Sequence, residues 1–187
     1  CPGVNRAWAG AAGLLAAVLP APAELVIELN KSCNLACRAC FGRGGEELPL
    51  KTAEKALREA AALGVGSARF TGGEPLLHPG LEKLLRLARE LGFYTLLNTN
   101  AVLFTPAIAR RLAGLVDNAL VSVPGVDEAG HAAGSGKAGL FARKTAAIKR
   151  LRSSGVKVVR AGTVASKPLL KEFDRWHKAV SGLGFDI

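Results

Sequence analysis

The chain has 187 residues, of which 49% are hydrophobic and 21% are charged, and its formal net charge is +10. That length suits one domain with a buried core, and the apolar content excludes global disorder. With 4 cysteines, the chain is not a disulfide-rich scaffold. The sequence contains no methionine and begins with Cys1, so we expect it to be part of a longer protein.

The positive charge is concentrated in the C-terminal part of the chain. Residues 1–136 hold 13 Lys/Arg and 12 Asp/Glu, whereas residues 137–178 hold 12 Lys/Arg against only Glu172 and Asp174. We interpret this basic block as the solvated faces of two helices. Attraction of nucleic acid or of an acidic partner is the alternative, although no nucleic-acid motif supports the former.

An apolar segment, Ala7–Ala23, resembles the apolar part of a secretory signal. Two prolines interrupt it, and it is short for a membrane span. We predict a short helix and a Pro-rich lead-in over residues 1–23, followed by the main domain over residues 24–187. Because clustered cysteines suit a reducing compartment, we expect a cytoplasmic protein that does not contact a membrane.

Short β-rich runs alternate with helical patterns from residue 24 onward. Strands are predicted at Glu24–Leu29, Ser67–Thr71, Tyr94–Asn98, Ala119–Val123 and Val156–Val164, and Phe185–Ile187 resembles the start of a sixth. Helices are predicted at Thr52–Leu63, 81–91, 105–115, Leu140–Ser153 and Leu169–Ser181. Thr52 and Thr105 are the expected N-caps of the first and third helices, and Gly125–Gly139 is the expected Gly-rich loop.

This alternation predicts an α/β fold. Consecutive strands joined by helices pair in parallel through right-handed crossovers. Five such units and the start of a sixth indicate a partial (β/α)₆ TIM-like barrel that is truncated near strand six. Polar residues at the carboxyl ends of the strands would then line the functional site.

Three clustered cysteines follow the first predicted strand: Cys33, Cys37 and Cys40. Thiolates at this spacing can hold one iron–sulfur cube from a single loop, and because a [4Fe–4S] cluster usually takes four cysteines, one iron would stay open. A structural zinc site would need a fourth ligand and usually has two separated pairs. The odd local number disfavours a disulfide framework. Three cysteines without a metal are the remaining alternative.

A Gly-Gly-Glu-Pro segment, Gly72–Pro75, follows the second predicted strand. Because glycines have no side chain, the backbone there can approach a ligand, and Glu74 can bind an ammonium group. Taken alone, the segment suits a plain β-turn. Its position one strand after the cysteines favours a binding site.

The order of these motifs resembles the radical S-adenosylmethionine (SAM) enzymes. That family has a CxxxCxxC motif followed by an aromatic residue, which here is Phe41. Gly72–Pro75 is similar to the family's GGEP segment, and Asn98–Asn100 to its TN-G sequence, with Ala101 in place of the glycine. Ser122 resembles the family's serine at the end of strand four. The resemblance extends from about residue 24 to the C-terminus.

The resemblance implies a set of cofactors and their ligands. Cys33, Cys37 and Cys40 would bind a [4Fe–4S] cluster, and SAM would chelate its open iron through amino and carboxylate groups. One-electron cleavage of SAM would give methionine and a 5′-deoxyadenosyl radical that removes a hydrogen atom from a substrate. The residues expected to bind SAM are Phe41, Gly72, Gly73, Glu74, Pro75, Thr99, Asn100, Ser122 and Lys137.

One segment departs from the family pattern. In the peptide-modifying branch, the loop after strand four often carries His-Asp and then an arginine that pairs with the SAM carboxylate. Here His131–Lys137 has neither the aspartate nor the arginine. Lys137 would substitute as a point charge. We expect His131 to be a loop residue, and His78 and His177 to be structural or exposed.

The motif set is most similar to family members that have an auxiliary-cluster, SPASM- or twitch-like, C-terminal domain. It therefore predicts peptide modification or cofactor maturation, with a flavodoxin- or ferredoxin-like electron donor and a peptide or small molecule as substrate. One alternative is a radical SAM enzyme that acts on another small molecule or on RNA. Another is a non-catalytic Fe–S electron-transfer protein, against which the GGEP segment argues.

Overall fold

The computed structural model describes residues 22–40, 42 and 44–186. Its centre is one open, parallel, five-stranded sheet in which the strands follow chain order. The strands are β1 (Glu24–Glu28), β2 (Ser67–Thr71), β3 (Tyr94–Thr99), β4 (Asn118–Ser122) and β5 (Val158–Gly162). This topology confirms the predicted α/β fold of the partial-barrel type.

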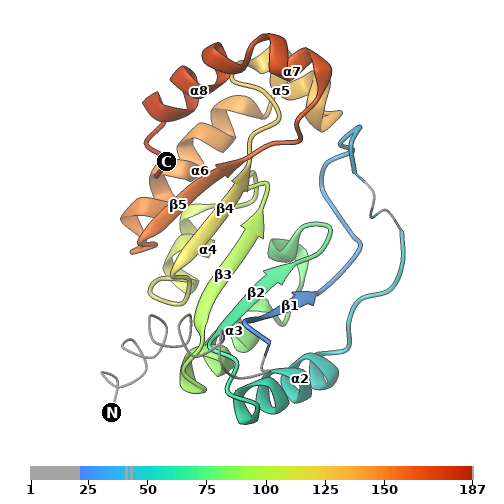
Figure 1. The fold of residues 1–187 in the computed structure, drawn as a ribbon, viewed down its shortest axis with the longest axis vertical. Helices are drawn as coiled ribbons and strands as arrows, with labels where there is room; N and C mark the ends of the chain where they lie inside the picture. The colour runs from blue at the N-terminus through green and yellow to red at the C-terminus, as the bar shows by residue number, and fades with distance from the viewer. Residues whose placement is uncertain (1–21, 41, 43, 187) are drawn as a thin grey trace.

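Helices connect the strands. They are α2 (Leu50–Ala62), η1 (Pro75–Leu77), α3 (Leu81–Glu90), α4 (Pro106–Arg111), α5 (Glu128–Ser135), α6 (Phe141–Ser153), α7 (Lys167–Lys171) and α8 (Phe173–Gly182). Figure 1 shows α5, α7 and α8 gathered at the end of the sheet toward which β4 points. This end is the carboxyl edge, where a barrel of this type has its site.

One buried row of side chains crosses all five strands. The pairing register places Ile27 beside Phe70, Phe70 beside Leu97, Leu97 beside Ala119, and Ala119 beside Val159. Each of the five is at most 3% exposed. Because a one-residue slip would turn a strand's apolar side chains to the other face, this row fixes the register.

The two predicted N-caps have different outcomes. Thr105 caps α4, because its side chain accepts a hydrogen bond from the Ile108 amide at 3.3 Å, and Pro106 follows as the first helical residue. The prediction for Thr52 is wrong, since α2 begins at Leu50 after Pro49. A proline fixes its own φ at a value that suits the entry to a helix, so the helix begins earlier than the threonine indicates.

The prediction that Gly125–Gly139 is a loop is also wrong, because this segment contains α5. Asp127 is the N-cap and accepts a hydrogen bond from the Gly130 amide at 2.7 Å, while Gly136 ends the helix with a φ of 70°. A Cβ on Gly134 would lie 2.5 Å from the Cβ of Pro124. The glycines inside this helix therefore serve close packing rather than loop formation.

The C-terminal elements are shorter than predicted. β5 covers Val158–Gly162 within the predicted strand Val156–Val164, and the predicted basic helix is divided at Glu172 into α7 and α8. No strand is assigned over residues 183–186, although the Asp186 amide donates to the Val159 carbonyl beside β5. Residues 1–21, with most of the predicted lead-in, lie outside the described residues.

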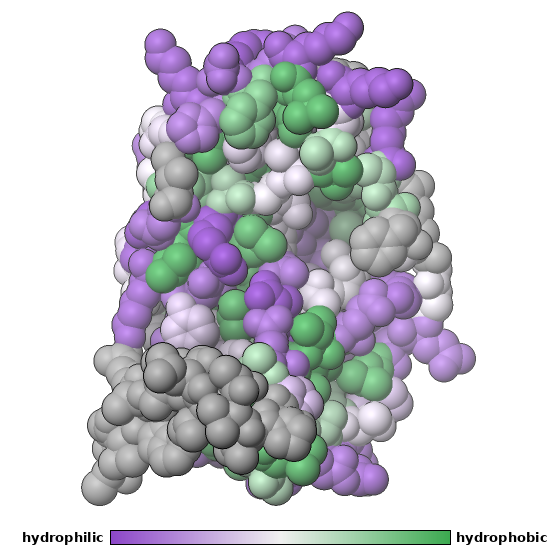
Figure 2. Space-filling view, in the orientation of Figure 1, coloured by the Kyte–Doolittle hydropathy of each residue, from purple (hydrophilic) through white to green (hydrophobic). Residues whose placement is uncertain are grey.

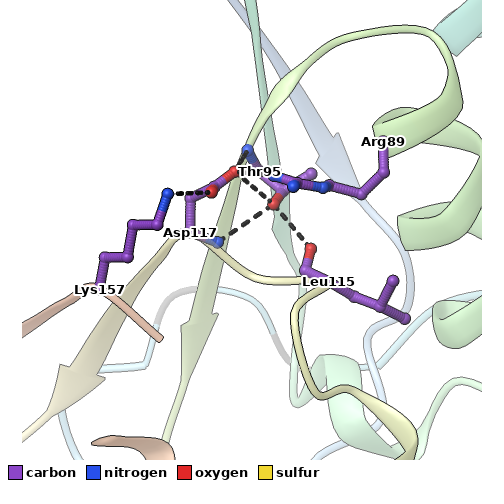
Figure 3. A network of polar contacts seen from close by, with 5 residues as sticks. All are labelled: Arg89, Thr95, Leu115, Asp117 and Lys157. Carbon is purple, nitrogen blue, oxygen red and sulfur yellow. Dashed lines mark hydrogen bonds and ion pairs between the residues drawn. The ribbon is translucent and has the colours of Figure 1, made fainter. Parts of the chain in front are cut away.

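A buried carboxylate organises the amino edge of the sheet (Figure 3). Asp117, which precedes β4, accepts hydrogen bonds from the amide and the hydroxyl of Thr95 and from Arg89 Nη1. Lys157 lies 3.9 Å from the same carboxylate, and the Thr95 hydroxyl donates to the Leu115 carbonyl. These contacts join α3, β3, β4 and the start of β5 at the edge opposite the carboxyl ends.

Within the described part of the chain, no helix has both the length and the apolar composition needed to span a membrane.

Candidate functional site

The sequence motifs that we singled out meet at the carboxyl edge of the sheet, because parallel strands end at the same edge. The cysteine loop follows β1, the two glycines follow β2, Asn100 follows β3, and Ser122 is the last residue of β4. The site is therefore assembled from four consecutive strand ends.

The turn after β2 anchors the start of the cysteine loop. The Gly73 amide donates to the Asn30 carbonyl at 2.7 Å, and the Glu74 amide donates to the Ser32 carbonyl at 2.8 Å. A Cβ on Gly73 would lie 2.2 Å from the Ser32 carbonyl oxygen. The glycine thus permits contact between two backbone segments, and both amides are used within the chain.

Helix α5 anchors the other end of the loop. The carbonyls of Gly134 and Ser135 in its last turn accept hydrogen bonds from the amides of Arg38 and Ala36, at 3.2 and 3.0 Å. A Cβ on Gly136 would lie 2.4 Å from the Ala36 carbonyl oxygen. The last carbonyls of a helix have no partner inside the helix, so the cysteine loop supplies one.

The three thiols lie on this anchored loop. Cys33 and Cys40 are exposed, Cys37 is half-buried, and none of them is in a disulfide. Burial of the sulfur raises the pKa of both Cys33 and Cys37, and charge on the neighbouring cysteines raises it further. Since only thiolates bind metal, binding at this loop would release protons.

The chemistry of the donor set suits an iron–sulfur cluster. Thiolates are the ligands of such clusters, and each thiolate of a cube binds a different iron. Among residues 22–40, 42 and 44–186, no three side chains of His, Cys, Asp or Glu converge on one point. Cys33, Cys37 and Cys40 are close enough to influence one another electrostatically. Phe41, the predicted aromatic neighbour, lies outside the described residues.

Glu74 is completely buried between the ends of β2 and β3. Its carboxylate accepts hydrogen bonds from the Thr99 hydroxyl at 2.7 Å, the Asn100 amide at 2.8 Å and the Leu76 amide at 3.1 Å. Burial raises the pKa of this carboxyl, while these three donors lower it. In this structure Glu74 fastens two strand ends together, and Pro75 is buried beside it.

Asn100 extends this connection to the cysteine loop. Its side-chain amide donates to Asn34 Oδ1 at 2.9 Å and lies 3.8 Å from Cys33 Sγ. Its oxygen accepts from the Val102 amide at 3.0 Å. The turn that follows contains Ala101 with a φ of 62°, a left-handed conformation that favours glycine.

A buried lysine that the sequence analysis missed lies at the end of β4. Lys144, in the first turn of α6, is 1% exposed and donates to the Ser122 carbonyl at 2.5 Å. Burial lowers its pKa to about 8, an effect that negative charge on Cys37 and Glu74 opposes. The sequence carried a signal for it, because Lys144 shares the helical period of the buried Ala147, Ile148 and Leu151.

The other predicted residues lie in varied environments. Lys137 is exposed in the turn between α5 and α6, and Ser122 is exposed at the end of β4. The prediction that His131 is a loop residue is wrong: it lies in α5, fully buried, 3.4 Å from the Ser135 hydroxyl. His78 is buried and accepts from the Gly80 amide, and His177 is exposed, as expected.

Comparison with known families agrees with this geometry. Residues 27–172 match the family model described as the Radical SAM superfamily. The chain therefore belongs to the radical SAM superfamily. Enzymes of this family use a [4Fe–4S] cluster and SAM, and the matched span includes all three cysteines and the segment Gly72–Pro75.

Two curated enzymes are similar to most of this chain. PqqA peptide cyclase of Gluconobacter oxydans is 38% identical over 142 residues, which cover 72% of this chain and 39% of that protein. AdoMet-dependent heme synthase of Methanosarcina barkeri is 32% identical over 174 residues, which cover 90% of this chain and 50% of that protein. The chain therefore spans half or less of the length of these relatives.

A solved structure has the same fold. The crystal structure of SuiB from Streptococcus suis matches with a TM-score of 0.76 and 27% identity, and the match covers 89% of this chain and 38% of SuiB. SuiB has also been solved bound to S-adenosylmethionine and to the precursor peptide SuiA.

Proposed function

We propose that the protein carrying this chain is a radical SAM enzyme that modifies a peptide. The observation that carries the proposal is a three-cysteine loop held at the carboxyl edge of a partial barrel, between the β2 turn and α5. Two relatives support the choice of substrate, since one is named a peptide cyclase and the other binds a precursor peptide.

The residues at the carboxyl edge of the sheet would bind the cluster and SAM. Cys33, Cys37 and Cys40 would hold the cluster, and the predicted SAM residues at the ends of β2, β3 and β4 (Gly72, Gly73, Thr99, Asn100 and Ser122) would face SAM beside it. When bound, the cluster supplies one electron that cleaves SAM to methionine and a 5′-deoxyadenosyl radical, which takes a hydrogen atom from the substrate. The protein contributes orientation and exclusion of water.

The cluster assignment is tested by single replacements. We expect the anaerobically reconstituted protein to lose its broad absorbance at about 400 nm in each of the variants Cys33→Ala, Cys37→Ala and Cys40→Ala. Cys1→Ala is the matched control and is expected to retain the absorbance. Loss of the cluster in Cys1→Ala together with its retention in Cys40→Ala would show that the ligand assignment is wrong.

The substrate class is tested by isotope transfer. The reconstituted protein, with dithionite and SAM, is incubated with a pool of synthetic peptides that carry deuterium on carbon. Hydrogen abstraction from a peptide would place deuterium in 5′-deoxyadenosine, which mass spectrometry detects. Formation of 5′-deoxyadenosine without deuterium would contradict peptide modification, and a protein that forms none would be better explained as an electron carrier.

A small-molecule substrate is the second candidate. The heme synthase is similar over 90% of this chain, a larger share than the peptide cyclase covers. A deuterated heme precursor therefore serves as the parallel arm of the same assay. Label transfer from that precursor, with none from the peptides, would favour cofactor maturation.

We also propose a flavodoxin- or ferredoxin-like protein as the electron donor. Figure 2 shows hydrophilic side chains projecting over α7 and α8. These two helices and the residue between them expose Lys167, Lys171, Arg175 and Lys178 against Glu172 and Asp174, so the surface is positive on balance. A basic surface attracts an acidic partner at a rate that falls with ionic strength. Reduction by an acidic donor is therefore expected to slow as salt is added, whereas reduction by dithionite serves as the control.

A further inference from the structure

Lys144 is a buried cation whose hydrogen bond goes to a backbone carbonyl and not to an acidic group. Among the described residues it forms no ion pair, and its one hydrogen bond is to the Ser122 carbonyl. It lies in the first turn of α6, where the helix dipole disfavours positive charge. Glu74 and the Cys37 thiol act on this ammonium group electrostatically, and a further anion in direct contact would stabilise the buried charge.

The position of Lys144 indicates which anion it would bind. The ammonium lies at the carboxyl end of β4, the same edge that carries the cysteine loop. Cys37 and Glu74 are near enough to act on it electrostatically. An ammonium group has three N–H donors, and the Ser122 carbonyl occupies one of them, which leaves two for a ligand.

In the peptide-modifying branch, the segment after β4 often carries an arginine that pairs with the SAM carboxylate. In this chain the segment has the uncharged Ser135 buried in α5 and Lys137 exposed in the turn beyond. We propose that Lys144 binds the carboxylate of SAM in this chain, and that Lys137 does not. The assignment rests on the proposed function, because it needs SAM at this edge. A lysine acts as a point charge, so it selects the carboxylate without a two-pronged geometry.

The test compares SAM with its decarboxylated analogue, which keeps the adenosyl, sulfonium and amino groups and lacks the carboxylate. Affinities for both are measured by anaerobic calorimetry on reconstituted protein, with iron and sulfide content determined for each variant. Lys144→Met removes the charge at similar volume, a change that buried sites often tolerate. Lys149→Met is the matched control, since Lys149 is exposed on the same helix.

Lys144→Met is expected to lower the affinity for SAM by about 10- to 100-fold. Its affinity for the analogue is expected to stay within about twofold, so the preference for the carboxylate shrinks, whereas Lys149→Met preserves it. If Lys144→Met does not retain iron, Lys144→Gln replaces it in the same comparison. An equal loss for both ligands would show a structural role and overturn the inference.

Two further outcomes separate this inference from the proposed function. Loss of the carboxylate preference in Lys137→Met, with Lys144→Met unchanged, would overturn the assignment to Lys144 alone. A wild-type protein that holds iron and sulfide and binds no SAM would overturn the proposed function, and the inference with it.

Discussion

The hydroxyl of Thr99 lies 2.7 Å from Oε1 of Glu74, and this contact joins the end of β3 to the turn after β2. Glu74 is completely buried and also accepts the amide of Asn100, whose side chain contacts the cysteine loop. The carboxylate therefore joins the ends of β2 and β3, and Asn100 extends this connection to the cysteine loop after β1. Its removal should affect the cysteine loop as well as the sheet.

We expect Glu74 and Thr99 to be energetically coupled. In urea unfolding of the apoprotein, Glu74→Gln and Thr99→Val should each destabilise the fold, and their double-mutant cycle should give a coupling of about 1–2 kcal/mol. Glu74→Gln paired with Asp117→Asn is the control, because Asp117 lies at the opposite edge of the sheet. That pair should be additive within about 0.5 kcal/mol. Additivity in the first cycle would contradict the connection described above.

Gly73 is expected to tolerate no side chain. In Gly73→Ala the new Cβ would lie 2.2 Å from one backbone oxygen, that of Ser32, and 2.7 Å from another, that of Lys31. Neither atom belongs to a flexible side chain, so the cysteine loop must move. We expect a loss of more than about 2 kcal/mol in unfolding free energy and a lower iron content after reconstitution.

Gly182→Ala is the matched control for Gly73→Ala. No atom lies within 4 Å of a Cβ at Gly182, in the last turn of α8. Replacement of an exposed helical glycine by alanine stabilises by about 0.5–1 kcal/mol. Normal iron content in both variants would show that the approach of Gly73 to the loop is dispensable.

The sheet was predictable because its signals are local and its strands are short. Ser67–Thr71 is predicted with the bounds that the structure gives, since a glycine flanks it on each side and apolar residues alternate within it. The cysteine loop and Gly72–Pro75 were likewise placed at adjacent strand ends from order alone. Parallel strands in chain order leave one edge for the segments that follow them.

The rest depended on packing that no local pattern encodes. The glycines of α5 predict a loop because glycine favours turns, whereas Gly134 is required by contact with Pro124 and Gly136 by contact with the backbone of Ala36. The burial of Lys144 has a sequence signal, its helical period with Ala147, Ile148 and Leu151, but a lysine in a basic segment is typical of a solvated surface, and the structure shows it to be 1% exposed. Glu74 was expected to meet a ligand, and its three donors lie within its own chain.

Ala101 offers a test of backbone strain at the site. Its φ of 62° costs a residue with a Cβ about 1–2 kcal/mol. Ala101→Gly relieves this strain but loses a buried methyl and adds freedom to the unfolded chain, so we expect a change within about 1 kcal/mol. Ala101→Val places a β-branched side chain at a fully buried position and should cost more than about 2 kcal/mol in urea unfolding. Equal stability of the two variants would contradict the left-handed conformation.

The N-cap of α5 is expected to control the cysteine loop from a distance. Asp127 begins the helix whose last carbonyls bind the amides of Ala36 and Arg38. Asp127→Ala removes the acceptor of the Gly130 amide, so α5 should fray and release the loop. Asp127→Asn keeps an acceptor there and is the matched control. We expect Asp127→Ala to lose iron faster to a chelator than the wild type, and Asp127→Asn to lose it more slowly than Asp127→Ala.

The same cap predicts a pH dependence of stability. The Gly130 amide, and then Arg175, hold the pKa of Asp127 below its ordinary value of 3.8. A carboxyl with a depressed pKa in the folded state contributes stability that is present above its unfolded pKa and is lost as the pH falls through its folded pKa. The apoprotein should therefore lose part of its unfolding free energy below about pH 3.8. Asp127→Asn cannot titrate, so its stability should fall less steeply with acid than that of the wild type. Parallel curves for the two proteins in urea titrations between about pH 5 and pH 2.5 would show that the ionised cap contributes nothing to α5.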